Sequence, residues 1–90
     1  MLVSLAEAKK YLRVDYDDED TLIRKFICTG SQLVKDTLRK SEEDFETVPT
    51  VRVAVLFAVA YLFEHREDAD MAVLTKNLRY ILSTEREAAF

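Results

Sequence analysis

Residues 49–66 read PTVRVAVLFAVAYLFEHR, and this stretch decides the fold. Pro49 has a fixed φ and no N–H donor, which suits the first turn of a helix. On a helical wheel the apolar side chains occupy two opposite sides, one with Val51, Val55, Ala58, Val59 and Leu62 and the other with Val53, Phe57 and Ala60. We therefore predict a central helix over about residues 49–66 that is apolar around its whole circumference.

A helix that is apolar on all sides must be covered on all sides. Three other helices, one of them short, do not supply that cover, so we predict that the chain associates with itself. The alternative is a closed monomer in which the other helices surround the central one completely. The candidate subunit-contact residues are Val53, Phe57, Tyr61, Leu74, Leu78 and Leu82.

The composition favours a small all-α bundle. The chain has 90 residues, of which 49% are hydrophobic and 33% charged, as in globular proteins. It contains one Gly and one Pro, where average usage gives about six and about four to five. Folds built from many tight turns are therefore disfavoured. We predict a single domain over residues 1–90 with about four helices, in which residues 85–90 form a frayed tail.

Three further helices follow from caps and periodicity. Ser4 and Glu7 form a capping box for a short helix that ends near Arg13. A second helix shows paired apolar positions, and a fourth carries one apolar stripe. The paired positions are Leu22/Ile23, Phe26/Ile27 and Leu33/Val34, and the stripe is Leu74, Leu78, Ile81 and Leu82. Gly30 lies within the apolar side of the second helix, which predicts close approach of another helix there.

The acidic run at residues 15–20 resembles a calcium loop only superficially. Asp15, Asp17 and Glu19 occupy the first three ligand positions of that loop. However, Asp20 replaces the required Gly and Phe26 replaces the closing Glu. We interpret the run as a cap for the second helix within a solvated loop, because carboxylates are stabilised at a helix N-terminus.

Catalytic and metal-binding residues are sparse. Cys28 is the single cysteine and His65 the single histidine, so a zinc site lacks ligands and a cysteine nucleophile lacks a recognisable partner. At the end of the central helix, His65 is predicted to meet the last carbonyl groups. The sequence predicts no metal site, no cofactor and no enzymatic activity.

Charge and hydropathy limit the partners. The net charge of −4 disfavours tight binding to phosphate backbones. The longest apolar run, Val53 to Phe63, spans about 17 Å as a helix, against ~30 Å for a bilayer core, so no membrane span is predicted. The N-terminal MLVSLAEAKK lacks the features of a signal peptide and Cys28 has no disulfide partner, so we expect an intracellular protein.

Two ordered patterns cover roughly residues 5–67. The first is Leu5-x-x-Ala8-Lys9-x-Tyr11-Leu12-Arg13-Val14-Asp15 followed by Asp18-Glu19-Asp20-x-Leu22-Ile23-x-x-Phe26-Ile27. The second is Val48-Pro49-x-Val51-Arg52-x-Ala54-Val55-Leu56, then Ala60-Tyr61-Leu62-Phe63-Glu64 and Arg66-Glu67. Together they resemble the phage head-tail connector family, also called phage DNA-packaging proteins or adaptors. The chain departs from the family at Phe63, where Tyr is usual, at Gly30, where Ala is usual, and beyond Asp68.

The resemblance implies a structural protein of a tailed phage or prophage. Members of this family assemble as a ring, dodecameric in the virion, between the portal protein and the head-completion or tail proteins. Genomic DNA passes through the ring without tight specific binding. The implied location is the host cytoplasm during assembly and then the head-tail junction, and no catalytic residue is implied.

Two other functions fit parts of the sequence. One is a helix-turn-helix-like DNA-binding regulator, although the basic residues of the second helix are interspersed with acidic ones. The other is a generic helical protein-interaction module, which the composition permits.

Overall fold

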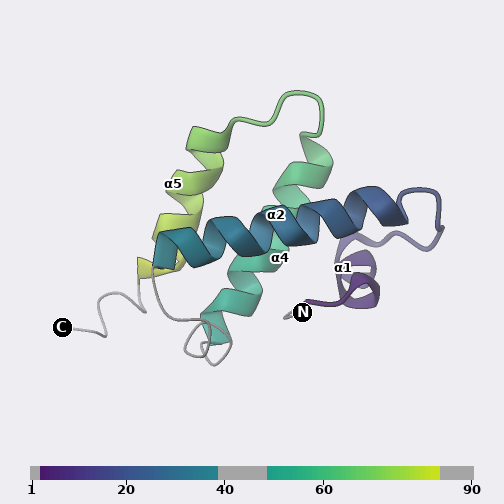
Figure 1. Ribbon diagram of the computed structural model, residues 1–90, viewed down its shortest axis with the longest axis horizontal. Helices are drawn as coiled ribbons and strands as arrows, with labels where there is room; N and C mark the ends of the chain where they lie inside the picture. The colour runs from purple at the N-terminus through teal and green to yellow at the C-terminus, as the bar shows by residue number, and fades with distance from the viewer. Residues whose placement is uncertain (1–2, 39–48, 84–90) are drawn as a thin grey trace.

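The computed structural model describes residues 3–38 and 49–83, which form four α-helices (Figure 1). In chain order they are α1 (Leu5–Leu12), α2 (Asp20–Leu38), α4 (Pro49–Glu64) and α5 (Met71–Ile81). The described ranges contain no strand, so the predicted all-α class is confirmed. The predicted acidic connection at 40–48 and the predicted frayed tail at 85–90 lie outside the described residues.

Local capping explains where α1 begins and ends. The Glu7 N–H donates to the Ser4 side-chain oxygen at 3.1 Å, as the capping box predicts. Arg13 has a φ of 62°, in the left-handed region typical of the residue after a helix, and its N–H donates to the Lys10 carbonyl. The first helix therefore ends at Leu12, next to its predicted end.

The ends of α4 agree closely with those predicted from the sequence. α4 begins at Pro49 as predicted and ends at Glu64, two residues before the predicted end. Asp70 caps α5, because its side chain accepts from the N–H groups of Ala72 at 3.0 Å and Val73 at 3.2 Å. Within the ranges described, each helix is too short or too polar to span a lipid bilayer.

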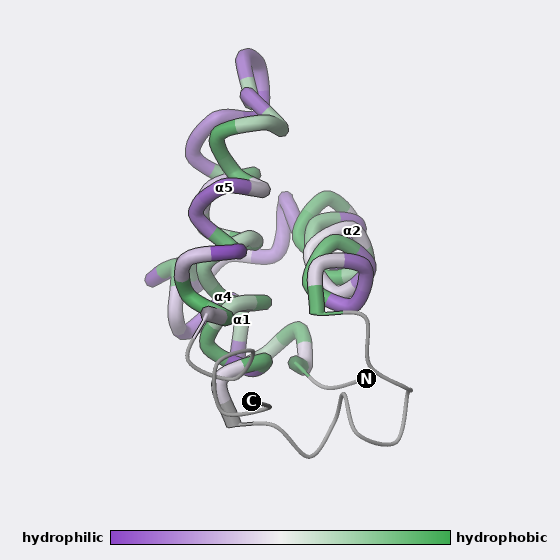
Figure 2. The backbone as a smooth tube through the Cα atoms, turned by 90° about the vertical axis from the view of Figure 1, so that its left-hand side faces the viewer, coloured by the Kyte–Doolittle hydropathy of each residue, from purple (hydrophilic) through white to green (hydrophobic). Residues whose placement is uncertain are grey.

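α2 crosses the antiparallel pair formed by α4 and α5. In Figure 1, α2 runs across the front of α4, and in Figure 2 it is seen nearly end-on beside the upright α4 and α5. α1 packs against α2 and α4 at one end of this arrangement. One side of α4 thus faces α2, and the side with Val51, Val55, Ala58, Val59 and Leu62 forms the centre of the core.

Gly30 marks the point where α2 and α4 come closest. A Cβ atom at this position would lie 3.1 Å from the Cβ of Ala58 and 3.6 Å from the carbonyl oxygen of Val55. The 3.1 Å contact is tighter than normal packing, whereas 3.6 Å is an ordinary contact, so a larger residue at this position requires a small shift of Ala58. The predicted close approach of another helix at Gly30 is confirmed.

Candidate subunit-contact surface

The side of α4 opposite α2 is only partly covered. Val53 is 59% exposed, Phe57 and Ala60 are half-buried, and Glu64 is exposed at the end of the helix. We call these four residues the α4 stripe. They follow one another at helical spacing, so they form one continuous strip of surface. The other described helices therefore leave part of the all-round apolar helix facing solvent.

Tyr61 lies beside the α4 stripe, and its side chain contacts the loop that connects α4 to α5. Its hydroxyl accepts from the Asp70 N–H at 3.1 Å and donates to the Asp70 carbonyl at 3.3 Å. Its ring stacks on the His65 imidazole with a centroid separation of 4.4 Å. Because Asp70 also caps α5, Tyr61 positions the start of that helix.

Leu74, Leu78 and Leu82, three of the six candidate subunit-contact residues, are fully buried inside the chain. Leu74 and Leu78 lie on the apolar side of α5, Leu82 is its C-cap residue, and all three pack into the core. A subunit-contact role stays a prediction for all six residues. Val53 and Phe57 are the ones on the α4 stripe, and Tyr61 is half-buried beside them.

The opposite side of α5 exposes residues that the sequence analysis missed. Val73 is 45% exposed and Tyr80 is 81% exposed, and the exposed basic residues Lys76 and Arg79 lie between them. We call these four residues the α5 outer face. Their apolar members fall outside the regular stripe of this helix. The detectable signal was a large aromatic residue on the polar side of an amphipathic helix.

Two ion pairs tie α4 to the first half of the chain. The Arg52 guanidinium lies 2.6 Å from Glu7 of α1. The Arg66 guanidinium lies 2.8 Å from Glu19, and it also stacks 4.6 Å above the Phe63 ring. The aromatic-Glu-x-Arg segment at the end of α4 thus connects this helix to the residue preceding α2.

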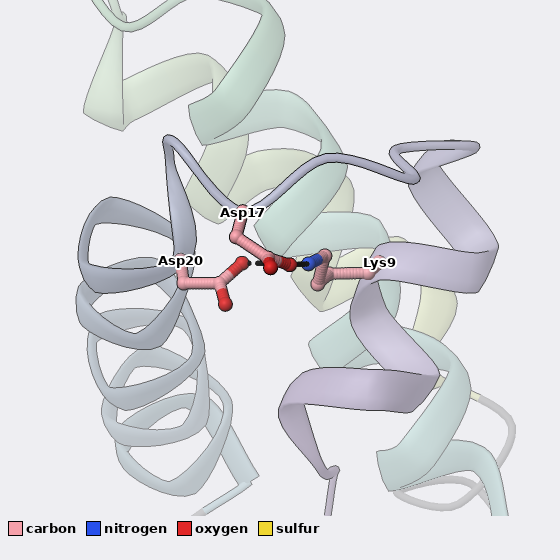
Figure 3. Close-up of polar contacts among 3 residues, drawn as sticks. All are labelled: Lys9, Asp17 and Asp20. Atoms are coloured by element: carbon pink, nitrogen blue, oxygen red, sulfur yellow. Dashed lines mark hydrogen bonds and ion pairs between the residues drawn. The ribbon is translucent and has the colours of Figure 1, made fainter.

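The acidic run before α2 binds basic side chains. The Lys9 ammonium lies 2.7 Å from the Asp17 carboxylate and 2.8 Å from that of Asp20 (Figure 3). Since Glu19 pairs with Arg66, three of the carboxylates contact cations contributed by other segments. These ion pairs add to the predicted placement of the run at the helix start, where Asp20 lies in the first turn of α2. The ion pairs hold α1 and the end of α4 against the start of α2.

The Lys9 pair shifts two pKa values in opposite directions. The hydrogen bond and charge of Lys9 hold the pKa of Asp17 below 3.8, and Asp17 with Asp20 raises the pKa of Lys9 above 10.5. The Asp17 contribution to stability is complete above its unfolded-state pKa and is lost as the pH falls through the lowered folded-state pKa. The Lys9 contribution is lost only as the pH rises through its raised pKa.

We accordingly expect Asp17→Asn to be less stable than wild type between about pH 5 and pH 9, with the difference shrinking below about pH 4. Urea denaturation across this pH range measures the difference. Asp18→Asn is the matched control, because Asp18 is exposed in the same loop and Lys9 pairs with Asp17 and Asp20 instead. A destabilisation by Asp17→Asn that persists undiminished at about pH 2 would contradict the assignment.

The remaining chemistry-bearing side chains are dispersed. The His65 imidazole stacks on Tyr61 and lies 3.7 Å from the Asp68 carboxylate, so it does not make the predicted contact with the last carbonyls of α4. Cys28 is exposed on α2. Among the residues described, no three His, Cys, Asp or Glu side chains are grouped so that they could hold a metal ion.

A small helical bundle that exposes large hydrophobic side chains on α1, α4 and α5 is typical of proteins that act by binding other proteins. The sequence matches the phage gp6-like head-tail connector proteins over residues 2–86, and the chain belongs to this family. The family is structural rather than enzymatic, and its place is the head-tail junction of the virion. Comparison with curated proteins and with solved structures returns no match at a significant level.

Proposed function

We propose that this protein forms the connector ring of a tailed phage or prophage, which joins the portal protein to head-completion or tail proteins. Family membership supports the general role of a head-tail connector. The observation that supports ring assembly most directly is the α4 stripe. Val53 and Phe57 expose apolar surface on a helix whose other side forms the core. Contact with a second copy removes that surface from water.

A ring constrains how this contact is made. Closed rings are built from heterologous contacts, in which two different surfaces of each subunit meet. The proposed ring is dodecameric in the virion, and residues 1–90 act as one connector-type domain. Assembly takes place in the host cytoplasm, and the finished ring lies at the head-tail junction.

Genomic DNA passes through the proposed ring without tight binding. The net charge of −4 supports this, since repulsion of the phosphate backbone prevents the DNA from being retained. Retention of duplex DNA by the rings at physiological salt would overturn this part of the proposal.

The decisive experiment places a charge in the α4 stripe. Val53→Asp is expected to weaken self-association at least about 100-fold, because desolvating a carboxylate in an apolar contact costs several kcal/mol and about 1.4 kcal/mol changes an equilibrium constant tenfold. Size-exclusion chromatography with light scattering and negative-stain microscopy, each with and without the portal, measure assembly. Wild type is expected to form annular particles in at least one of these conditions.

Tyr16→Asp is the matched control, since Tyr16 is 47% exposed but lies in the loop between α1 and α2. It is expected to assemble like wild type. A wild-type protein that stays monomeric at every concentration and beside the portal would overturn the ring. Normal rings formed by Val53→Asp would overturn the role of the α4 stripe.

A further inference from the structure

We propose that neighbouring subunits meet through two different helices, with the α4 stripe of one copy packed against the α5 outer face of the next. This inference rests on the proposed ring and names the surfaces that build it. The occupant of each surface is therefore a second copy of this chain.

The two surfaces are separate, as a heterologous contact requires. The α4 stripe lies opposite the side of α4 that packs on α2. The α5 outer face lies opposite Leu74, Leu78 and Leu82, which pack into the core. α4 and α5 run antiparallel behind α2 (Figure 1), and the two surfaces lie on different helices of the same subunit.

Both surfaces present exposed apolar groups. Val53 and the edge of Phe57 offer aliphatic and aromatic surface on α4, whereas Val73 and Tyr80 do so on α5. At 81% exposed, Tyr80 is the most exposed of the large hydrophobic residues in the described part of the chain. Tyrosine is enriched among the residues that dominate binding energy in interfaces.

The charges of the two surfaces are complementary. The α4 stripe ends at Glu64, and exposed Glu67 follows it. The α5 outer face instead carries Lys76 and Arg79, both exposed. Such complementarity steers association and selects the correct partner surface.

Two other pairings fit these charges less well. In a contact between two α4 helices, the basic residue that α4 itself supplies is Arg52, which already lies 2.6 Å from Glu7. The outer side of α2 has the basic residues Arg24 and Lys25, but none of the large hydrophobic side chains exposed in the described part of the chain lies on α2. The α5 outer face combines basic residues with exposed apolar residues.

Cysteine cross-linking tests the pairing directly. In a Cys28→Ser background, Val53→Cys and Tyr80→Cys are introduced singly and together, and assembled protein is treated with a short bismaleimide. The double variant is expected to give a ladder of dimers, trimers and larger species. Each single variant is expected to stay uncross-linked, and an equimolar mixture of the two single variants is expected to give dimers without larger species.

Three outcomes would overturn the pairing. One is a cross-linked dimer from Val53→Cys alone, which indicates an isologous contact between α4 helices. Another is equal cross-linking in a Val53→Cys/Tyr16→Cys control, because Tyr16 lies outside both surfaces. The third is the absence of a ladder while the same sample contains rings. If the Cys28→Ser protein forms no rings at all, even with the portal, the ring itself fails.

Charge reversal supplies an independent readout. Glu64→Lys/Glu67→Lys and Lys76→Glu/Arg79→Glu are each expected to weaken assembly about tenfold, because each gives the two meeting surfaces charge of the same sign. Combining all four changes restores complementarity, and assembly is expected to return to within about twofold of wild type. A combined variant as weak as either pair would overturn the pairing.

Discussion

Replacing Gly30 with leucine is expected to lower the free energy of unfolding by about 2–3 kcal/mol, because the added side chain overpacks the crossing of α2 and α4. The first added atom already lies 3.1 Å from the Cβ of Ala58. That Cβ is attached directly to the backbone of α4, so it cannot rotate away. The two helices must separate, and the core on both sides of Gly30 loses contacts.

Gly30→Ala is the matched control for this prediction. Alanine gains up to about 1 kcal/mol of helix propensity over glycine, and the tight contact offsets that gain, so its net effect is expected to stay within about 1 kcal/mol. Urea denaturation in the Val53→Asp background measures both variants without a contribution from assembly. If leucine is tolerated as well as alanine, α2 and α4 do not cross at Gly30.

Leu78→Ala is expected to destabilise the folded chain by about 2–5 kcal/mol, the cost of emptying a fully buried leucine position. Leu78 is 0% exposed within a single chain. The loss should therefore be independent of protein concentration. A side chain that only contacts a neighbouring subunit would instead affect stability at concentrations where subunits associate.

Tyr80→Ala is the comparison, because it changes an exposed residue on the same helix. In the Val53→Asp background it is expected to alter the free energy of unfolding by no more than about 0.5 kcal/mol. Thermal and urea unfolding of the two variants over a range of protein concentrations distinguish a residue of the core from a residue of the subunit contact. A concentration-dependent loss for Leu78→Ala would instead place Leu78 at the subunit interface.

The family signature at the end of α4 has a structural explanation. Phe63 and Arg66 stack on each other, and Arg66 pairs with Glu19 just before α2. Tyr61 fastens the turn that leads to α5 through Asp70. The signature thus connects α4 to both of its neighbours along this end of the molecule, while Glu64 and Glu67 stay exposed.

The candidate surface was predictable only in part. The opposed apolar sides of residues 51–62 predict a helix with more apolar surface than the other helices can cover. Val53 and Phe57 lie on the side that is left partly exposed. The apolar stripe of the fourth helix led to the prediction of Leu74, Leu78 and Leu82 as contacts, and all three are buried within the single chain. Such a stripe shows that a helix is buried without showing against what, so their contact role stays a prediction. The sequence did not predict Tyr80 as a contact residue, because Tyr80 belongs to no periodic apolar pattern.

Local sequence signals account for the helices and their ends. Caps and helical periodicity involve residues three or four apart, so Ser4, Pro49 and Asp70 act on the chain next to them. The tertiary structure decided which side of α4 is covered and which partner each charge takes. Arg66 and Glu19 are 47 residues apart in the chain, and their pairing depends on how α2 crosses α4. That crossing depends on packing between distant segments, which no local pattern encodes.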